Sequence, residues 1–444
     1  MFLDTSHRTI SYSQFIDNEL SHFSIYDCKR SIPSVVDGFK PSQRKIMYGV
    51  FKKKLTKEIK VAQLSGYVSE HSAYHHGEAS LNGTIVNMAQ DFVGSNNLNL
   101  LTPNGQFGTR LEGGKDSASE RYIFTQLSSF TRMIFPEADD AVLEYNHDDG
   151  DPIEPVYYVP ILPMVLVNGC RGIGTGTSTN VLCYHPGHLI DYLVARLQGS
   201  NDKLNLVPHY RGFQGTIDLK QGKYVVKGVY VKRELVVHLT ELPIGVWTVE
   251  YKEHLESQIG VTIKEYSDNS TDKVVDMSIR LMAECDVEKV LKLSTTLSIS
   301  NMNLFDADEH LKKYVEIHDI MEEFYDVRYA TYEKRKVHQL KVLRDTLHKV
   351  EQKVKYIRAV LSGKLDLRNK KQDVLYRELA SLAIEMREES YSYLTKMPMD
   401  SVTQEKVEAL EKEFKEIQEE VARLTAMTVE QMWIQELVAL KKAI

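Results

Sequence analysis

Two runs of regular heptad spacing in the last third of the chain constrain its fold more than any other feature. Apolar residues recur there at alternating intervals of three and four, which places each run along one face of a helix. The first run is Leu340, Leu343, Leu347, Val350, Val354, Ile357 and Leu361, and the second is Val407, Leu410, Phe414, Ile417, Val421 and Leu424. Two matching seams joined by roughly 45 residues predict an antiparallel coiled-coil hairpin with a small helical insert.

The outgoing helix of this hairpin is predicted to be long. A helix over about 311–361 would span ~75 Å, which is too long to be buried against its own domain. We therefore expect the tip, a globular insert at about 362–402, to contact a partner. A last helix is predicted after the second seam, because Thr428 and Gln431 have the spacing of a capping box.

The chain as a whole is predicted to be α+β and multidomain. At 444 residues it is too long for one hydrophobic core. Helical periodicity and glycine-rich turns fill residues 1–150, period-two apolar patterns dominate 151–310, and helices fill 311–444. The predicted strands are 215–219, 224–231, 234–239 and 276–282.

Four helices and one long loop are predicted in the first 150 residues. The helices are one that begins at a capping box over 11–14, then 41–53, 60–68 and 80–92. We expect Phe15, Leu20 and Phe23 to form the buried face of the first helix. A glycine-rich segment, 94–115, follows the last one, and a structureless stretch of that length is typical of a functional loop.

Composition excludes several classes of protein. The first fifteen residues lack the apolar segment of a secretory signal, and the longest apolar run, near 161–169, is too short to span a membrane. The cysteines lie far apart without a CxxC pair, which argues against a zinc ribbon and a disulfide scaffold and favours a reducing compartment; they are Cys28, Cys170, Cys183 and Cys285.

The charge of the chain is distributed unevenly. The net charge is -7, yet residues 29–60 carry ten Lys/Arg against two acidic residues, Asp37 and Glu58. A basic face on an acidic protein suits a polyanionic partner that touches one part of the surface. The alternative is a solvated, lysine-rich helix face without a partner.

Tyr122 is the candidate nucleophile. Most tyrosines are packing residues with a satisfied hydroxyl, and that is the alternative here. The surroundings favour chemistry, since Arg121 is adjacent, His75 and His76 lie upstream, and the basic segment precedes both. Such cations would stabilise a phenolate and a pentacovalent phosphate, as a nucleophilic attack on a phosphodiester requires. For His75, a core histidine is an equally good interpretation.

Four long segments resemble the breakage-reunion region of type IIA DNA topoisomerases. They are residues 30–50, 60–81, 90–127 and 160–179, which stand in the family's order. The HHGE and GQFGTRLEGGKDSAS wordings resemble the eukaryotic and large-DNA-virus type more than bacterial gyrase. The resemblance implies a winged-helix domain with the tyrosine in 1–150, a strand-rich tower in 151–310, and a coiled coil with an exit gate in 311–444.

The resemblance also implies a role for individual residues. Tyr122 would attack a DNA strand and form a 5′-phosphotyrosyl bond, with Arg121 holding the scissile phosphate, Arg30 assisting in the transition state and His76 hydrogen-bonding the phosphate. Ile173 would wedge between base pairs and bend the duplex, unless it is a buried strand-end residue. Further DNA-binding residues would be Lys40, Arg44, Lys45, Gln106 and Lys115, although Lys40 and Arg44 also fit a solvated face.

The family requires Mg²⁺ and ATP, and we expect both to be bound by a partner polypeptide or by residues outside this chain. Asp306 and Asp308 have the spacing of a DxD metal pair, but no second acidic cluster surrounds them in the sequence. They match the family's bridge into the coiled coil, so we expect them not to bind metal, and no metal ligand is predicted here.

The function predicted from these observations is that of the DNA-cleaving subunit or fragment of an ATP-dependent type II topoisomerase. It would bind double-stranded DNA as a homodimer, with contacts near 356–399 and near Tyr122, together with an ATPase and metal-binding partner, and without a membrane. The expected setting is intracellular, with DNA, in a nucleus or a virus-infected cell. The alternative is a non-catalytic, DNA-bending architectural dimer on the same scaffold.

Overall fold

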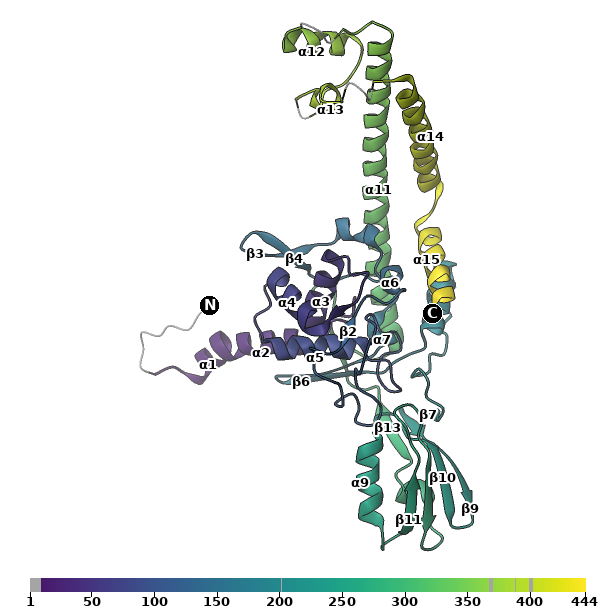
Figure 1. The fold of residues 1–444 in the computed structure, drawn as a ribbon. Helices are drawn as coiled ribbons and strands as arrows, with labels where there is room; N and C mark the ends of the chain where they lie inside the picture. Colours follow the sequence, from purple (N-terminus) through teal and green to yellow (C-terminus); the bar gives the residue numbers. More distant parts are fainter. Residues whose placement is uncertain (1–8, 201, 367–369, 388, 399–401) are drawn as a thin grey trace. The chain divides into compact units, whose positions relative to one another are not determined.

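The computed structural model describes residues 9–200, 202–366, 370–387, 389–398 and 402–444. The chain divides into two compact units. The larger unit runs up to Thr331 and includes Trp433–Ile444, and the smaller unit is Tyr332–Met432. The fold is a mixture of helices and short antiparallel sheets (Figure 1), as the sequence predicts. No helix in the described part of the chain is long and apolar enough to cross a membrane.

The larger unit begins with a helical segment made of α1 (Tyr12–Phe15), a π-helical turn (Ile16–Leu20) and α2 (Ser21–Ser31). The predicted capping box at its start is present, with Ser11 and Gln14 bonded reciprocally. The prediction of a buried apolar face is wrong, because Phe15, Leu20 and Phe23 are 44%, 38% and 58% exposed. The reason is that α2 packs against strand β5 through its last turns, where Cys28 is buried.

Three helices form the next layer of the larger unit. They are α3 (Pro41–Lys52), α4 (Val61–Ser72) and α5 (Glu78–Ala89), which pack on one another through buried apolar side chains. The short strand β1 (Ile59–Lys60) enters α4 and pairs antiparallel with β2 (Phe124–Thr125). This pairing brings the end of the glycine-rich segment back to the helices.

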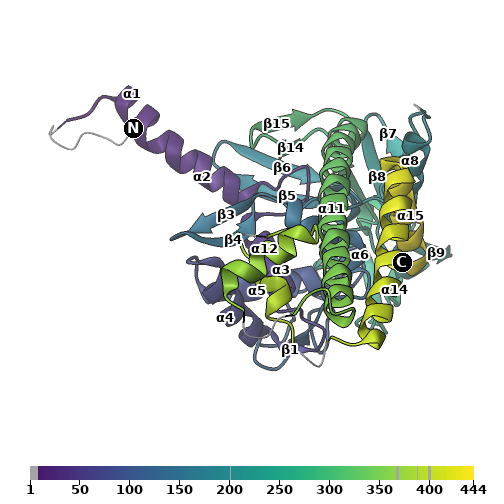
Figure 2. The same ribbon diagram turned by 90° about the horizontal axis from the view of Figure 1, so that it is seen from above.

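Short helical segments and three hairpins surround that helical layer. The helices are α6 (Thr131–Ile134), a 3-10 helix (Glu137–Val142), α7 (Met164–Val167) and α8 (Pro186–Leu197). The hairpins are β3–β4 (Tyr145–Asp148, Asp151–Pro155), β5–β6 (Cys170–Gly174, Thr177–Val181) and β14–β15 (Met302–Phe305, Leu311–Tyr314). Strand β14 lies beside β6 (Figure 2), where the Asn303 amide donates to the Ser178 carbonyl at 2.7 Å.

Two sheets form the strand-rich part of the larger unit. The three-stranded sheet has the order β13-β8-β7, and the four-stranded sheet has the order β11-β12-β10-β9. The strands are β7 (Thr216–Lys220), β8 (Lys223–Lys227), β9 (Val229–Arg233), β10 (Val236–Glu241), β11 (Ile263–Asp268), β12 (Met277–Leu281) and β13 (Ser294–Ser298). Helices α9 (Thr248–Gln258) and α10 (Val287–Val290) accompany them, and α9 covers one face of the four-stranded sheet (Figure 1).

One strand prediction in this region is wrong. The apolar run 224–231 does not form a single strand, because the chain breaks at Gly228 and passes from β8 in one sheet to β9 in the other. A Cβ at Gly228 would lie 2.2 Å from the Glu241 carbonyl oxygen, so only glycine lets the two backbones approach this closely. Alternating side chains on both sides of the break give one continuous pattern in the sequence.

Helix α11 (Ile317–Leu361) begins in the larger unit and continues into the smaller one. In the larger unit, its buried residues include Ile320, Met321 and Phe324, and the Phe324 ring lies 6.3 Å from the ring of Trp433. Trp433 belongs to α15 (Val429–Ala443) and donates its indole N–H to the Ile161 carbonyl at 3.0 Å. The predicted capping box at the start of α15 is confirmed by reciprocal bonds between Thr428 and Gln431.

The smaller unit contains the antiparallel helix pair that the seams predict. Helix α14 (Gln404–Ala426) runs against α11, since Lys336 donates to the Thr425 carbonyl and Arg358 pairs with Glu411. Along the seam, the residues buried in one apolar core include Val350, Ile357, Val407 and Leu410. Leu361 is 46% exposed, because α11 ends there and the seam ends with it.

The segment between the paired helices contains α12 (Gln372–Ser381) and α13 (Ser392–Thr395). Leu379, Tyr391 and Leu394 from this segment join the same core as the seam. The predicted insert at 362–402 is therefore partly helical and packed in its described residues, whereas 367–369, 388 and 399–401 lie outside them.

Candidate functional site

Tyr122 has a rigid backbone and a free side chain. The Tyr122 N–H donates to the Ser119 carbonyl at 2.9 Å, and the next residue, Ile123, is buried and accepts from the Val61 N–H at 3.1 Å. The Tyr122 side chain is nevertheless 77% exposed. The packing interpretation of this tyrosine is therefore excluded, since a buried neighbour fixes the backbone while the phenol remains open to a large substrate.

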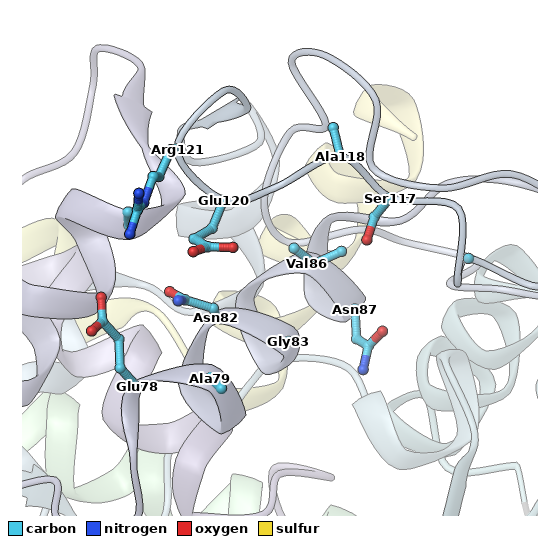
Figure 3. Close-up of a pocket in the computed structure, with 12 residues that line it drawn as sticks. Glu78, Ala79, Asn82, Gly83, Val86, Asn87, Ser117, Ala118, Glu120 and Arg121 are labelled. Atoms are coloured by element: carbon cyan, nitrogen blue, oxygen red, sulfur yellow. The ribbon is translucent and has the colours of Figure 1, made fainter.

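Arg121 lies next to a pocket that reaches from the Tyr122 turn to the start of α5. The cavity has a volume of about 420 Å³ and is lined by Arg121, Glu120 and Ser117 on one side and by α5 residues on the other. Figure 3 shows Arg121 and Glu120 pointing toward the first turns of α5, where Glu78 and Asn82 lie. Arg121 is itself exposed, so its guanidinium is available to an anion.

The glycine-rich loop that precedes Tyr122 is held from two sides. At the end of α5, the Gln90 amide donates to the carbonyls of Phe107 (2.8 Å) and Gly114 (3.3 Å). On the other side, the Val249 N–H at the start of α9 donates to the Leu111 carbonyl at 3.0 Å. The loop has no regular secondary structure, but these bonds give it a defined shape.

Trp247 closes the loop against the strand-rich part of the unit. Gly113 has φ +64°, and a Cβ there would lie 2.3 Å from the Trp247 ring, so both its conformation and its lack of a side chain are required. The Trp247 ring also makes an edge contact with Phe92, at 5.8 Å between centroids. Trp247 was not among the predicted site residues, because nothing in its local sequence indicates a contact with residue 113.

His76 lies in the turn before α5, in a basic and aromatic environment. Its Nε2 is 2.9 Å from the Tyr26 hydroxyl, and its ring is 4.2 Å from that of His75. Burial lowers the pKa of His76, and the positive charges of Arg30, His75 and Lys45 lower it further. His75 is exposed, so the interpretation of His75 as a core histidine is wrong.

Arg30 belongs to the same cluster. It lies in the last turn of α2, its side chain is exposed, and its charge acts on His76. Within the described residues, no hydrogen bond or ring contact joins Tyr122 to this cluster. The structure thus brings Arg30 and His76 together, and places Arg121 and Tyr122 side by side on a neighbouring turn.

Lys40 and Ile173 are joined through one hairpin. The Lys40 ammonium donates to the Arg171 carbonyl of β5 at 2.9 Å, and burial lowers its pKa. Ile173 is in the same strand and is 85% exposed. The alternative of a buried strand-end isoleucine is therefore wrong. Gly172 allows the close packing of this hairpin on α2, because a Cβ there would lie 2.1 Å from the Ser31 carbonyl oxygen.

Arg44 and Lys45 have protein partners. Arg44 forms a bidentate pair with Asp37 at 2.7 and 3.1 Å, and its side chain is 12% exposed. Lys45 pairs with Glu154 at 2.9 Å and is 14% exposed. These pairs fix the basic face to the unit that carries it, and the predicted contacts of both side chains with DNA stay predictions.

The remaining predicted site residues lie on the surface of the glycine-rich loop. Gln106 is exposed and has a weak bond, at 3.4 Å, to Asp116. Lys115 is 76% exposed and lies 3.7 Å from Glu250 of α9. Both side chains can turn toward a ligand at small cost, because these contacts are long and open to solvent.

The predicted absence of metal ligands at Asp306 and Asp308 has a structural basis. One carboxylate oxygen of Asp306 accepts from the backbone N–H groups of Asp308 (3.0 Å) and His310 (2.7 Å), which closes the turn between β14 and β15. Among the described residues, no group of three or more His, Cys, Asp or Glu side chains is arranged to hold a metal ion. The residues present therefore do not fit a Mg²⁺ site.

Comparison with known proteins identifies the class of this arrangement. A family model for the A subunit of DNA gyrase/topoisomerase IV matches residues 30–438. The chain therefore belongs to this family, the DNA-cleaving chains of type II topoisomerases.

Individual relatives are eukaryotic topoisomerases. The chain is 40% identical over 458 residues to the mitochondrial DNA topoisomerase 2 of Dictyostelium discoideum, covering 99% of this chain and 36% of that protein. It is 43% identical over 498 residues to DNA topoisomerase 2 of Arabidopsis thaliana, covering 99% and 34%. The chain thus spans about a third of the length of these relatives.

A solved structure agrees with the sequence relatives. The DNA-binding, cleavage and re-ligation domain of Plasmodium falciparum topoisomerase II matches this chain with a TM-score of 0.90 and 40% identity. The match covers 100% of this chain and 65% of that one. The predicted family is confirmed, and its eukaryotic character is confirmed with it.

Proposed function

We propose that this chain is the DNA-cleaving part of an ATP-dependent type II DNA topoisomerase. The observation that carries the proposal is the Tyr122 phenol, which is 77% exposed beside the exposed Arg121 on a backbone pinned by β1 and β2. A catalytic phenol must reach a duplex that is too large to enter a closed pocket, and this one does not have to unfold anything to do so.

In the proposed reaction, the Tyr122 oxygen attacks a phosphorus of the DNA backbone. A bond from this oxygen to phosphorus forms as the bond from phosphorus to O3′ breaks, and the phenolic proton is balanced by the one gained on the 3′-hydroxyl. Arg121 and Arg30 stabilise the negative charge of the pentacovalent phosphate, and His76 donates a hydrogen bond to it. One phosphodiester replaces another, so religation by the reverse step needs no nucleotide.

The parts of the fold support separate tasks in this reaction. We assign α3, α4 and α5 with β1 and β2 to a winged-helix platform for double-stranded DNA. We assign the two sheets with α9 to a tower that bends the duplex. The helix pair α11 and α14, with α12 and α13, is assigned to an exit gate where two copies of the chain meet. A second contact between the copies is proposed near Tyr122.

Mg²⁺ and ATP are assigned to a partner polypeptide or to sequence outside this chain. When bound, Mg²⁺ polarises the phosphate; since the described residues do not fit this ion, no step above is routed through it. The setting that suits a DNA substrate is intracellular, in a nucleus or a virus-infected cell.

The proposal is tested by supplying the ATPase and metal-binding polypeptide with supercoiled plasmid, Mg²⁺ and ATP. We expect ATP-dependent relaxation only when this chain is added, and two plasmid linking-number steps per event because both strands are cut. Binding and bending of DNA without any change in linking number would favour the architectural dimer instead.

Ile173 provides a specific prediction for DNA bending. Replacing Ile173 with alanine is expected to abolish most of the bend in a cleavage-site duplex, because no apolar side chain then offsets the unstacking cost of a few kcal/mol per step. Folding is expected to change by less than about 0.5 kcal/mol, since the side chain is exposed. Energy transfer between dyes at the duplex ends measures the bend. A duplex that bends equally with Ile173→Ala rules out the wedge.

Gly113 provides a prediction for the loop that carries the nucleophile. Gly113→Ala is expected to displace the loop from Trp247 and to lower the cleavage rate by roughly 10²-fold, the scale of a 1 Å misplacement, while DNA affinity changes little. The control is Gly66→Ala in α4, where a Cβ meets no atom within 4 Å. Single-turnover cleavage separates rate from binding, and equal rates for both variants would show that the loop contact is unimportant.

A further inference from the structure

Tyr26 and His76 form a contact that the proposed reaction does not use. Tyr26 lies on α2, one turn before Arg30 and on the same helix face. Its hydroxyl is 2.9 Å from His76 Nε2, and the two ring centroids are 6.0 Å apart with a tilt of 49°. Tyr26 is 50% exposed, so burial of its ring does not explain its position.

We infer that Tyr26 is a positioning residue for His76, which it holds in the Nδ1–H tautomer so that this N–H is directed to the DNA backbone. The inference rests on the proposed function, because it concerns how His76 meets a phosphate. It adds a group that acts through the histidine and not on the DNA itself.

The charges around His76 favour a neutral ring. Arg30 of α2, Lys45 of α3 and the neighbouring His75 act on it from three elements, and each disfavours an added positive charge. Glu154 is an acidic side chain in this group, and its carboxylate is bonded to Lys45. A neutral imidazole has one N–H and one acceptor nitrogen, so the hydroxyl that contacts Nε2 decides which nitrogen carries the hydrogen.

Only one of the two tautomers serves a phosphate. If the Tyr26 O–H donates to Nε2, the hydrogen of the ring lies on Nδ1 and can be donated to a phosphate oxygen. If Nε2–H donates to the Tyr26 oxygen, Nδ1 has a lone pair that repels that oxygen. The phenol has its own hydrogen to give, so the first arrangement satisfies Tyr26, His76 and the phosphate together.

The helix that carries Tyr26 is anchored firmly enough to position another residue. Asp27 accepts from the backbone N–H (2.8 Å) and hydroxyl (2.9 Å) of Thr175, in the turn between β5 and β6. Cys28 is buried against the same hairpin. Tyr26 and Arg30 are therefore presented by one fixed helix, beside the hairpin that carries Ile173.

The test compares Tyr26→Phe with the unchanged chain. In ¹⁵N-histidine NMR of the 444-residue chain, with His76→Gln identifying the signal, we expect the Nδ1–H tautomer in the unchanged protein. Tyr26→Phe is expected to shift the population toward Nε2–H and to raise the pKa of His76, since the bond that favours the neutral ring is lost. With the partner polypeptide and Mg²⁺ present, cleavage should slow about three- to tenfold at saturating DNA, with affinity unchanged.

The control is Tyr12→Phe, a residue 89% exposed whose hydroxyl has no partner among the described residues; it should change neither signal nor rate. An Nε2–H tautomer in the unchanged protein, or a Tyr26→Phe variant with the original tautomer and rate, overturns the inference. Failure of the proposed function is a separate result, because DNA adducts that persist in Tyr122→Phe would refute the nucleophile while leaving the NMR outcome as it is.

Discussion

Replacing Tyr122 with phenylalanine is expected to remove covalent protein–DNA adducts and to lower the rate of cleavage by at least about 10³-fold. The phenylalanine ring fills the same space but has no oxygen to attack phosphorus. Because the side chain is 77% exposed, the change should not affect folding or DNA binding. The measurement is denaturant trapping of adducts on a labelled duplex, with the ATPase and metal-binding partner and Mg²⁺ supplied.

Two controls make this result specific. Tyr12→Phe removes a hydroxyl from another exposed tyrosine and is expected to keep full adduct formation. Arg121→Lys keeps the charge but loses the planar guanidinium, and should reduce cleavage without abolishing it. Adducts at the original level in Tyr122→Phe would mean that another side chain is the nucleophile.

Replacing Arg328 with methionine is expected to destabilise the larger unit by about 3–5 kcal/mol, because the change leaves a buried carboxylate without its counter-charge. The Arg328 guanidinium donates to Asp139 at 2.6 Å and to the Val159 carbonyl at 2.7 Å. The two side chains of the pair are 0% and 4% exposed. Urea unfolding followed by tryptophan fluorescence measures the loss, since both tryptophans, Trp247 and Trp433, lie in this unit.

The comparison with two further variants separates a buried pair from an exposed one. Adding Asp139→Leu to Arg328→Met should recover much of the lost stability, because no unpaired charge of this pair then remains buried. Lys227→Met removes a half-exposed partner of Glu288 and should cost no more than about 1 kcal/mol. If Arg328→Met costs no more than Lys227→Met, the buried pair does not hold the unit together.

The sequence predicts those features whose cause is local. The capping boxes at Ser11 and Thr428 are confirmed because the bonding partners lie within four residues of each other. The helix pair is confirmed because its seam repeats over many turns, and an error at one position does not change the period. The cleavage motif was identified by its resemblance, and the exposure of Tyr122 and Ile173 agrees with it.

Features that depend on distant residues were not predictable from pattern alone. The break at Gly228 depends on how closely the Glu241 backbone approaches, and the exposed face of α1 and α2 depends on what the helix contacts. Arg44 has the sequence pattern of a solvated basic residue until Asp37 is placed beside it. Tyr26 was missed for the same reason, because its partner His76 is fifty residues away in the chain.

Identification of the residue that is linked to DNA tests the central claim most directly. Adducts trapped with a duplex would be digested with nuclease and protease, and the nucleotide-bearing peptide sequenced by mass spectrometry. We predict a 5′-phosphoryl nucleotide on Tyr122 and a free 3′-hydroxyl at the break. A nucleotide on any other residue, or a link through a 3′-phosphate, would contradict the account.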